Sequence, residues 1–196
     1  RGLFVCFATE LWERFSFYGM KFLLLLYLAK YHLFSDSDGL EVLGAYAALV
    51  YAMPVIGGLL ADRYLGMRKA VIFGGVLLVL GHLGMALEGE QARQVGDTVV
   101  RDTGTLQAFY FSLALIVIGV GFLKPNISTI VGRLYGTDDP RRDAGFTIFY
   151  MGINIGAMIA PVVTQILAQR YFGTSDMPAY KVVFITAGIG MVISLF

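Results

Sequence analysis

The chain has 196 residues, of which 57% are hydrophobic and 15% are charged, and its formal net charge is +1. Soluble domains are closer to ~45–50% apolar and ~25% charged, so this composition and a mean hydropathy of +0.71 indicate an integral membrane protein. The near-neutral charge and the scattered basic residues argue against a nucleic acid partner. One cysteine and two distant histidines, His32 and His82, provide no disulfide framework, and we expect no metal site.

Apolar residues gather in six blocks along the chain, and a helix of about 20 residues crosses a hydrocarbon core of about 30 Å. The predicted membrane helices of this all-α protein cover approximately residues 3–31, 40–61, 70–87, 106–134, 144–171 and 180–196. The first block is too long and too charged for a cleavable signal peptide. Because the sequence starts at Arg1 and stops inside the sixth block, we interpret it as a fragment of a longer protein.

Polar and charged side chains interrupt the first predicted helix at Glu10, Glu13, Arg14, Tyr18 and Lys21. A charge at mid-bilayer depth costs about 2.5–3.5 kcal/mol on insertion scales, so such residues by default mark a substrate or ion pathway. At about 100° per residue, Glu10, Arg14 and Lys21 fall within roughly 40° of one another. Arg14 can reach either glutamate, which lets the cluster rearrange when one carboxylate takes a proton. The alternative is a static ion pair that fixes helix packing.

The turn after the second predicted helix is polar and basic, with Gly58, Asp62, Arg63, Gly66, Arg68 and Lys69. Asp62 can pair with a neighbouring arginine or cap another helix in one conformational state and not in another, which would make this turn part of a gate. The alternative is a solvated turn whose positive charges only fix topology. Lysine and arginine are densest here and in the turn after the fourth helix, so both ends of the chain are predicted to be cytoplasmic.

Lys124 lies well inside the fourth predicted helix, next to Pro125. An isolated buried ammonium group tends to lose its proton or to find a carboxylate, and the buried carboxylates available are Glu10 and Glu13. We therefore predict that the first and fourth helices face one cavity, with Lys124 near Glu10 and Arg14. The alternative is a lysine that snorkels to the membrane surface.

The second and fifth helices contribute two further candidates for the lining of this cavity. Tyr51 could line it, although packing between helices is the commoner role of a tyrosine. Asn154 is polar and mid-span, so it should bond across helices or meet a ligand. In the same helix, Gly152, Gly156 and Ala160 form a ridge of small residues that permits close approach of another helix.

Four stretches of the chain resemble motifs of one transporter family. Residues 10–19, ELWERFSFYG, resemble the ExxERFxYYG motif of proton-dependent oligopeptide transporters. The turn around Asp62 is similar to the loop motif of the major facilitator superfamily. Residues 121–126 and 141–157 are similar to the fourth and fifth helices of the peptide transporters. The motifs occur in the correct order over nearly the whole chain, with one departure: Phe17 replaces the first tyrosine of the pair and removes a hydroxyl.

The resemblance implies the N-terminal six-helix bundle of a two-bundle transporter, built from 3+3 inverted repeats, with the substrate site between the bundles near the midplane. The C-terminal bundle is absent from this chain. The resemblance assigns proton coupling to Glu10, Glu13, Arg14 and Lys124. It assigns peptide binding to Arg14, Tyr18, Tyr51, Lys124 and Asn154.

The expected function is proton-coupled symport of di- and tripeptides by alternating access. The expected partners are the peptide, protons, the lipid bilayer and the C-terminal bundle, without a cofactor, in a plasma or bacterial inner membrane. One alternative keeps the fold and carries nitrate or another small anion. Two others are a passive channel and an intramembrane enzyme, and the sequence has neither the HExxH nor the GxSxG motif of an enzyme.

Overall fold

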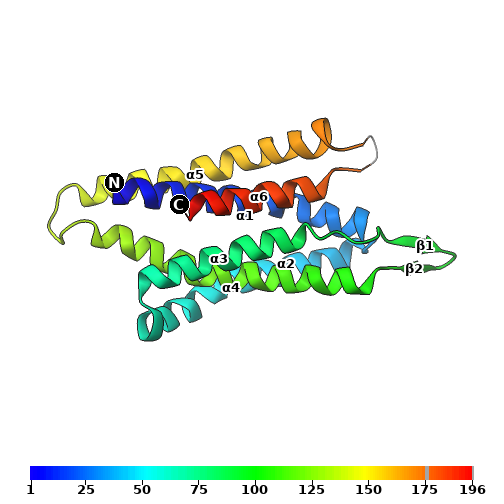
Figure 1. The fold of residues 1–196 in the computed structure, drawn as a ribbon, viewed down its shortest axis with the longest axis horizontal. Coiled ribbons are helices and arrows are strands. Elements are labelled where there is room, and N and C mark those ends of the chain that lie inside the picture. Colours follow the sequence, from blue (N-terminus) through cyan, green and yellow to red (C-terminus); the bar gives the residue numbers. More distant parts are fainter. Residues whose placement is uncertain (175–176, 196) are drawn as a thin grey trace.

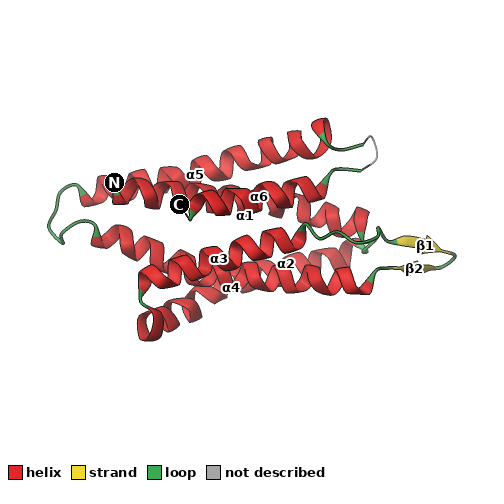
Figure 2. Cartoon of the chain, viewed as in Figure 1, coloured by secondary structure: helices red, strands yellow, loops and turns green. Residues whose placement is uncertain are grey.

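A computed structural model of the chain describes residues 1–174 and 177–195. Within these residues the six predicted helices are present (Figures 1 and 2). Their bounds are α1 Gly2–Leu26, α2 Asp36–Leu60, α3 Met67–Met85, α4 Thr103–Arg133, α5 Arg142–Gln165 and α6 Tyr180–Ser194. Three π-helical turns, Tyr27–Tyr31, Ala61–Leu65 and Ile166–Tyr171, extend α1, α2 and α5. Phe196, the last residue of the sixth predicted helix, lies outside the described residues.

The helices pack as two interlocked groups of three. α1 packs against α5 and α6, α4 packs against α2 and α3, and α3 meets α6 (Figure 1). If α1, α2 and α3 are exchanged with α4, α5 and α6, the α1–α5 contact corresponds to α4–α2 and the α1–α6 contact corresponds to α4–α3. The α3–α6 contact corresponds to itself. This is the contact pattern expected of two three-helix repeats, so the all-α bundle with 3+3 organisation is confirmed.

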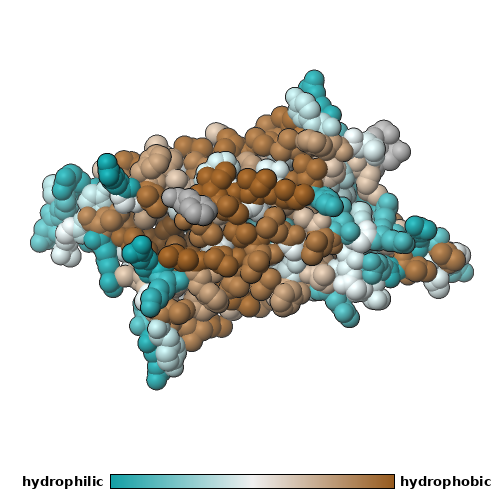
Figure 3. All heavy atoms as spheres, viewed as in Figure 1, coloured by the Kyte–Doolittle hydropathy of each residue, from teal (hydrophilic) through white to brown (hydrophobic). Residues whose placement is uncertain are grey.

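On the face seen in Figure 3, apolar residues cover the middle of the bundle and hydrophilic residues gather at its two ends. Among the described residues, four helical segments are long and apolar enough to cross a membrane: Asp36–Leu65, Met67–Met85, Thr103–Arg133 and Arg142–Tyr171. α1 has the length but carries the charges of Glu10, Glu13, Arg14 and Lys21. The described part of α6 has 15 residues. α1 therefore fails the criterion for a membrane span because of its charges, and the described part of α6 fails it because of its length.

In two of the helices that start earlier than predicted, α2 and α4, a side chain caps the first turn. α2 begins at Asp36 rather than near residue 40, since the Ser35 hydroxyl accepts the Asp38 amide at 3.2 Å. α4 begins at Thr103 rather than near residue 106, where Asp102 accepts the amides of Gly104 and Thr105. Hydrogen bonds from the Thr105 hydroxyl and amide lower the pKa of Asp102, which keeps this cap ionised.

The connection between α3 and α4, predicted only as a polar loop, contains a β-hairpin of β1 Arg93–Val95 and β2 Thr98–Val100. Gly96 occupies its two-residue turn at a φ of +62°, a conformation that favours glycine. The ends of this connection are tied to the end of α1. The Tyr31 hydroxyl donates to the Gly89 carbonyl at 2.6 Å, and the Arg101 guanidinium donates to the His32 carbonyl at 2.6 Å.

Glycines set the closest helix crossings. A Cβ on Gly57 of α2 would meet the backbone carbonyl of Gly121 on α4. On α5, a Cβ on Gly152 would lie 2.8 Å from the Phe7 carbonyl oxygen, and one on Gly156 would meet the Leu11 carbonyl of α1. The predicted small-residue ridge of α5 is therefore confirmed as the surface on which α1 packs.

Candidate functional site

The charged residues of α1 form a buried cluster. Glu10 and Glu13 are each 1% exposed and Arg14 is 4% exposed. Nη2 of Arg14 donates to Oε1 of Glu13 at 2.5 Å, and its Nε contacts Oε2 of the same carboxylate. The Arg14 Nε is 3.6 Å from Oε1 of Glu10. Arg14 thus reaches both glutamates, as predicted, but it holds Glu13 with two bonds and Glu10 only loosely.

Aromatic rings support the cationic side of the cluster. The guanidinium carbon of Arg14 lies 4.8 Å from the centroid of the Phe17 ring and 5.9 Å from that of Tyr18. The ammonium group of Lys21 lies 5.6 Å from the Phe17 ring. Such contacts stabilise a cation where water is excluded. The arginine therefore has favourable contacts on its aromatic side as well as its carboxylate partner.

Lys124 is half-buried on α4, and its ammonium group lies 5.9 Å from the centroid of the Tyr51 ring on α2. It is close enough to Glu10 to act on that carboxyl group electrostatically. No ion pair within 4.0 Å joins Lys124 to a carboxylate of the described residues. Of the predicted neighbours of Lys124, Glu10 is thus reached only beyond ion-pair distance, and an aromatic partner of Lys124 is Tyr51.

The other predicted peptide-binding residues lie outside the buried cluster. Tyr18 is half-buried beside Arg14, Tyr51 is 69% exposed, and Asn154 is exposed on α5. The Asn154 amide donates to the Tyr150 carbonyl at 2.9 Å, within its own helix. The expectation of a bond from Asn154 to another helix is therefore wrong for this conformation. An amide that turns back on its own backbone remains available to a ligand on the exposed side.

The turn after α2 has a specific backbone geometry. The π-helical turn Ala61–Leu65 leads into Gly66, whose φ of +75° reverses the chain before α3. A Cβ on Gly58 would lie 3.7 Å from the Pro125 ring, so α2 crosses α4 close to Lys124. Asp62 and Lys69 are exposed, and Asp62 forms no ion pair with a described residue. The predicted pairing of Asp62 is not made in this conformation.

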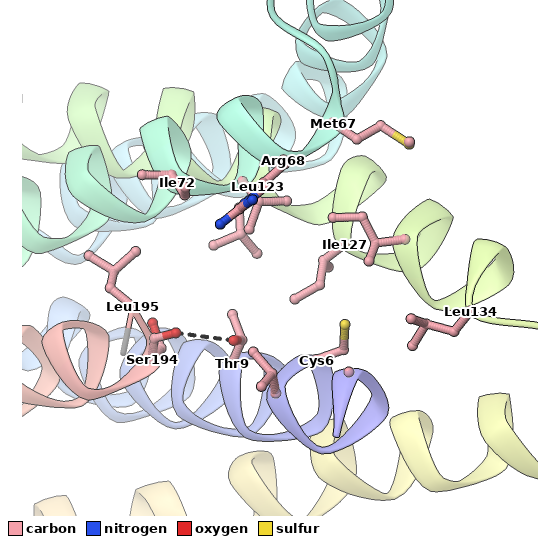
Figure 4. A pocket seen from close by; sticks show the side chains of 14 residues that line it. Cys6, Thr9, Met67, Arg68, Ile72, Leu123, Ile127, Leu134, Ser194 and Leu195 are labelled. Atoms are coloured by element: carbon pink, nitrogen blue, oxygen red, sulfur yellow. Dashed lines mark hydrogen bonds between the residues drawn. The ribbon is translucent and has the colours of Figure 1, made fainter.

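The remaining bases of the turn have different surroundings. The Arg63 guanidinium lies 5.5 Å from the Tyr64 ring. Arg68, at the start of α3, points into a cavity of about 470 Å³ (Figure 4). α1, α3, α4 and α6 surround this cavity, and most of its lining is apolar; its polar side chains include Thr9, whose hydroxyl donates to the Ser194 carbonyl at 3.1 Å. Sequence reasoning missed the cavity because its lining comes from four separate helices with no shared motif.

The turn between α4 and α5 contains one exposed ion pair. Nη2 of Arg141 is 2.8 Å from Oδ2 of Asp139. The hydrogen bond from the Arg141 side chain lowers the pKa of Asp139 to about 2, so the pair is charged throughout the physiological range. Among the residues that the structure describes, no group of three or more His, Cys, Asp and Glu side chains could hold a metal ion.

Comparison with known proteins agrees with the architecture and the motifs. The family profile for PTR2, described as the POT family, matches residues 68–196. The chain is 41% identical to the "Uncharacterized transporter YclF" of Bacillus subtilis, over 100% of this chain and 36% of that protein. It is 40% identical to a "Di-/tripeptide transporter" of Lactococcus lactis subsp. lactis, over 100% of this chain and 36% of that protein.

Solved structures give the same result. A crystal structure of a peptide transporter POT in complex with sulfate has a TM-score of 0.84 at 41% identity, covering 99% of this chain and 36% of that one. A POT family transporter in complex with 5-aminolevulinic acid has a TM-score of 0.84 at 36% identity, covering 100% of this chain and 37% of that one. The chain spans about a third of the length of these relatives and matches a part of their N-terminal half. It belongs to the POT family of membrane transporters and has the six-helix fold of the N-terminal half of a major facilitator superfamily protein.

Proposed function

We propose that this chain is the N-terminal half of a proton-coupled symporter of di- and tripeptides that works by alternating access. The observation that carries the proposal is the buried cluster of Glu10, Glu13 and Arg14, with Lys124 nearby on α4. A relative of the chain is named a di-/tripeptide transporter, and one solved relative holds a conjugated peptide. The other half of the substrate site would come from a C-terminal bundle.

Charge balance gives the coupling mechanism. With both glutamates ionised, two negative and two positive side chains cancel, which is the arrangement that a low-dielectric interior tolerates best. A proton on one carboxylate leaves one positive charge in excess. The carboxylate of one peptide restores neutrality, so the proton and the peptide each favour binding of the other.

Arg14 is the group that connects the two ligands. Its guanidinium can form a two-pronged bond with a carboxylate, and in this conformation Glu13 occupies that fork. Protonation of one glutamate removes a negative charge beside Arg14 and releases the guanidinium towards the peptide. Lys124 then acts as a second, point-like attraction for the same carboxylate, and Tyr18, Tyr51 and Asn154 contact the peptide backbone or line its pocket.

The loop motif fits a gate in this scheme. Gly58 allows α2 to pass close to Pro125, next to Lys124, so a change at the substrate site is transmitted to the turn. We propose that Asp62 and the bases of the motif (Arg63, Gly66, Arg68 and Lys69) make contacts in another conformational state. The proposed location is a plasma or bacterial inner membrane with the N-terminus cytoplasmic, and no cofactor other than protons is expected.

The experiment that tests the function is uptake of a labelled dipeptide into vesicles that contain the full-length protein with this sequence. With an inward proton gradient, unlabelled dipeptides should reduce labelled uptake to background, and nitrate at the same concentration should not. A protonophore should abolish accumulation. Equal competition by nitrate would favour the anion carrier, because an excess positive charge can bind either nitrate or a peptide carboxylate. Uptake that does not depend on the proton gradient would indicate a channel. Chemical conversion of the substrate by the purified protein would indicate an enzyme.

A further inference from the structure

Tyr46 on α2 has a hydroxyl that the fold leaves without a partner. The residue is 3% exposed, and its ring stacks on Phe17 of α1 with centroids 6.2 Å apart and planes at 23°. Its hydroxyl oxygen is buried and has no hydrogen-bond partner among the described residues. Buried hydroxyls are normally bonded, because desolvation without a partner is unfavourable. A phenylalanine would make the same stack without this cost, so the hydroxyl itself requires an explanation.

The unpaired hydroxyl lies beside the charge cluster. The Phe17 ring that Tyr46 stacks on has the Arg14 guanidinium carbon at 4.8 Å from its centroid. The charges of both Glu13 and Arg14 act electrostatically on the Tyr46 hydroxyl. Tyr46 is therefore within the field of the same ion pair that the coupling mechanism must open.

When the Arg14–Glu13 ion pair opens, the Glu13 carboxylate loses its hydrogen-bond donors. Both of its carboxylate oxygens are held by Arg14, and the residue is 1% exposed. When the proton lies on Glu10 and Arg14 turns to a substrate carboxylate, Glu13 is left ionised and buried without a donor, which is strongly unfavourable. A hydroxyl in reach of Glu13 would remove this penalty.

We propose that Tyr46 is a positioning residue that donates its hydroxyl hydrogen to the Glu13 carboxylate once Arg14 has moved to the substrate. The proposal rests on the proposed function, because it concerns the state in which a peptide carboxylate holds Arg14. Tyr46 thereby supplies, from α2, a hydroxyl next to the position where Phe17 lacks one. In the conformation described here, the Tyr46 hydroxyl has no hydrogen-bond partner among the described residues.

The surroundings of Glu13 determine in which direction loss of the Tyr46 hydroxyl changes proton binding by the two glutamates. On α1, the ionisable groups around Glu13 and Tyr46 are Glu10, Arg14, Tyr18 and Lys21, whose ammonium group lies 5.6 Å from the Phe17 ring. On α4, the charge of Lys124 reaches Glu10. From α5 and α6, the residues that meet this part of α1 include Gly156, Ala187 and Gly190, which carry no ionisable group. A hydrogen bond donated to a carboxylate stabilises its ionised form, so loss of the Tyr46 hydroxyl makes the glutamate pair hold its proton more tightly.

The test is the pH dependence of dipeptide binding to the purified full-length protein. In the wild type, affinity falls as the pH rises and the coupled proton is lost. For Tyr46→Phe the midpoint of this fall should move upward by about one pH unit, the size expected for one hydrogen bond to an ionised group. Substitution of 3-fluorotyrosine at position 46 retains the ring and strengthens the donor, so the midpoint should move downward.

Tyr180→Phe is the matched control. Tyr180 is 1% exposed, and its hydroxyl donates to the Leu26 carbonyl at 3.1 Å, at the end of α1 away from the charge cluster. This variant should keep the wild-type midpoint. Unchanged midpoints in both the Tyr46→Phe protein and the 3-fluorotyrosine protein would overturn the proposal. A melting curve shows whether the Tyr46→Phe protein is folded. If it is not folded, the midpoint of the 3-fluorotyrosine protein decides. Absence of dipeptide binding by the wild type would instead contradict the proposed function.

Discussion

Arg14→Ala is expected to reduce gradient-driven dipeptide uptake to background and to destabilise the protein. Arg14 is 4% exposed and holds Glu13 with two bonds, so its loss leaves two buried carboxylates without their cation. Breaking a buried ion pair from one side typically costs about 3–5 kcal/mol. The measurement is uptake by the full-length variant in vesicles, together with its melting temperature in detergent.

The matched control for Arg14→Ala is Arg93→Ala. Arg93 forms a 3.6 Å pair with Glu90, with side chains 75% and 80% exposed, and an exposed pair contributes little to stability. This variant should transport and melt like the wild type. The destabilisation by Arg14→Ala should be smaller at acid pH, because protonation of the glutamates removes their uncompensated charge. Uptake by Arg14→Ala at the wild-type rate would remove Arg14 from the mechanism.

Gly156→Leu is expected to prevent correct packing of α5 on α1 and thereby to abolish folding and transport together. A Cβ at this position would meet the Leu11 carbonyl and would lie 3.1 Å from Cβ of Arg14. Overpacking of a buried site usually costs about 1–3 kcal/mol, and more where the opposing atoms belong to backbone. The yield of monodisperse full-length protein after purification measures the effect.

Gly44→Leu provides the comparison at an open position of α2. A Cβ on Gly44 would have no atom within 4 Å, and the residue is exposed. The same change in side-chain volume should therefore leave yield and uptake close to the wild type. Equal yields for the two leucine variants would mean that α5 can move away from α1 without loss, contrary to the close crossing described above.

The sequence predicts the bundle because membrane helices follow from local composition. The six apolar blocks, the small residues of α5 and the charged stripe of α1 each depend on neighbours in the chain, and their burial follows from the cost of polar groups in lipid. The predicted starts of α2 and α4 were wrong by a few residues, since Ser35 and Asp102 act through side-chain hydrogen bonds that hydropathy does not register.

The features that were missed depend on contacts between distant segments. The hairpin at residues 93–100 is short and exposed on both faces, so it has no alternating pattern to detect. The spacing places Glu10 on the same face of α1 as Arg14, but the side-chain directions make Glu13 the closer partner. The unpaired hydroxyl of Tyr46 and the cavity beside Arg68 emerge only when helices from both repeats come together.

In the proposed mechanism, α1 and α4 carry one charge network that couples the proton to the substrate. Dipeptide uptake by full-length Lys124→Ala in vesicles with an inward proton gradient tests it most directly. Lys181→Ala, which removes an exposed lysine at the start of α6, is the control and should transport normally. We expect Lys124→Ala to fold and insert but to accumulate no dipeptide. Accumulation at the wild-type level would contradict the proposed mechanism.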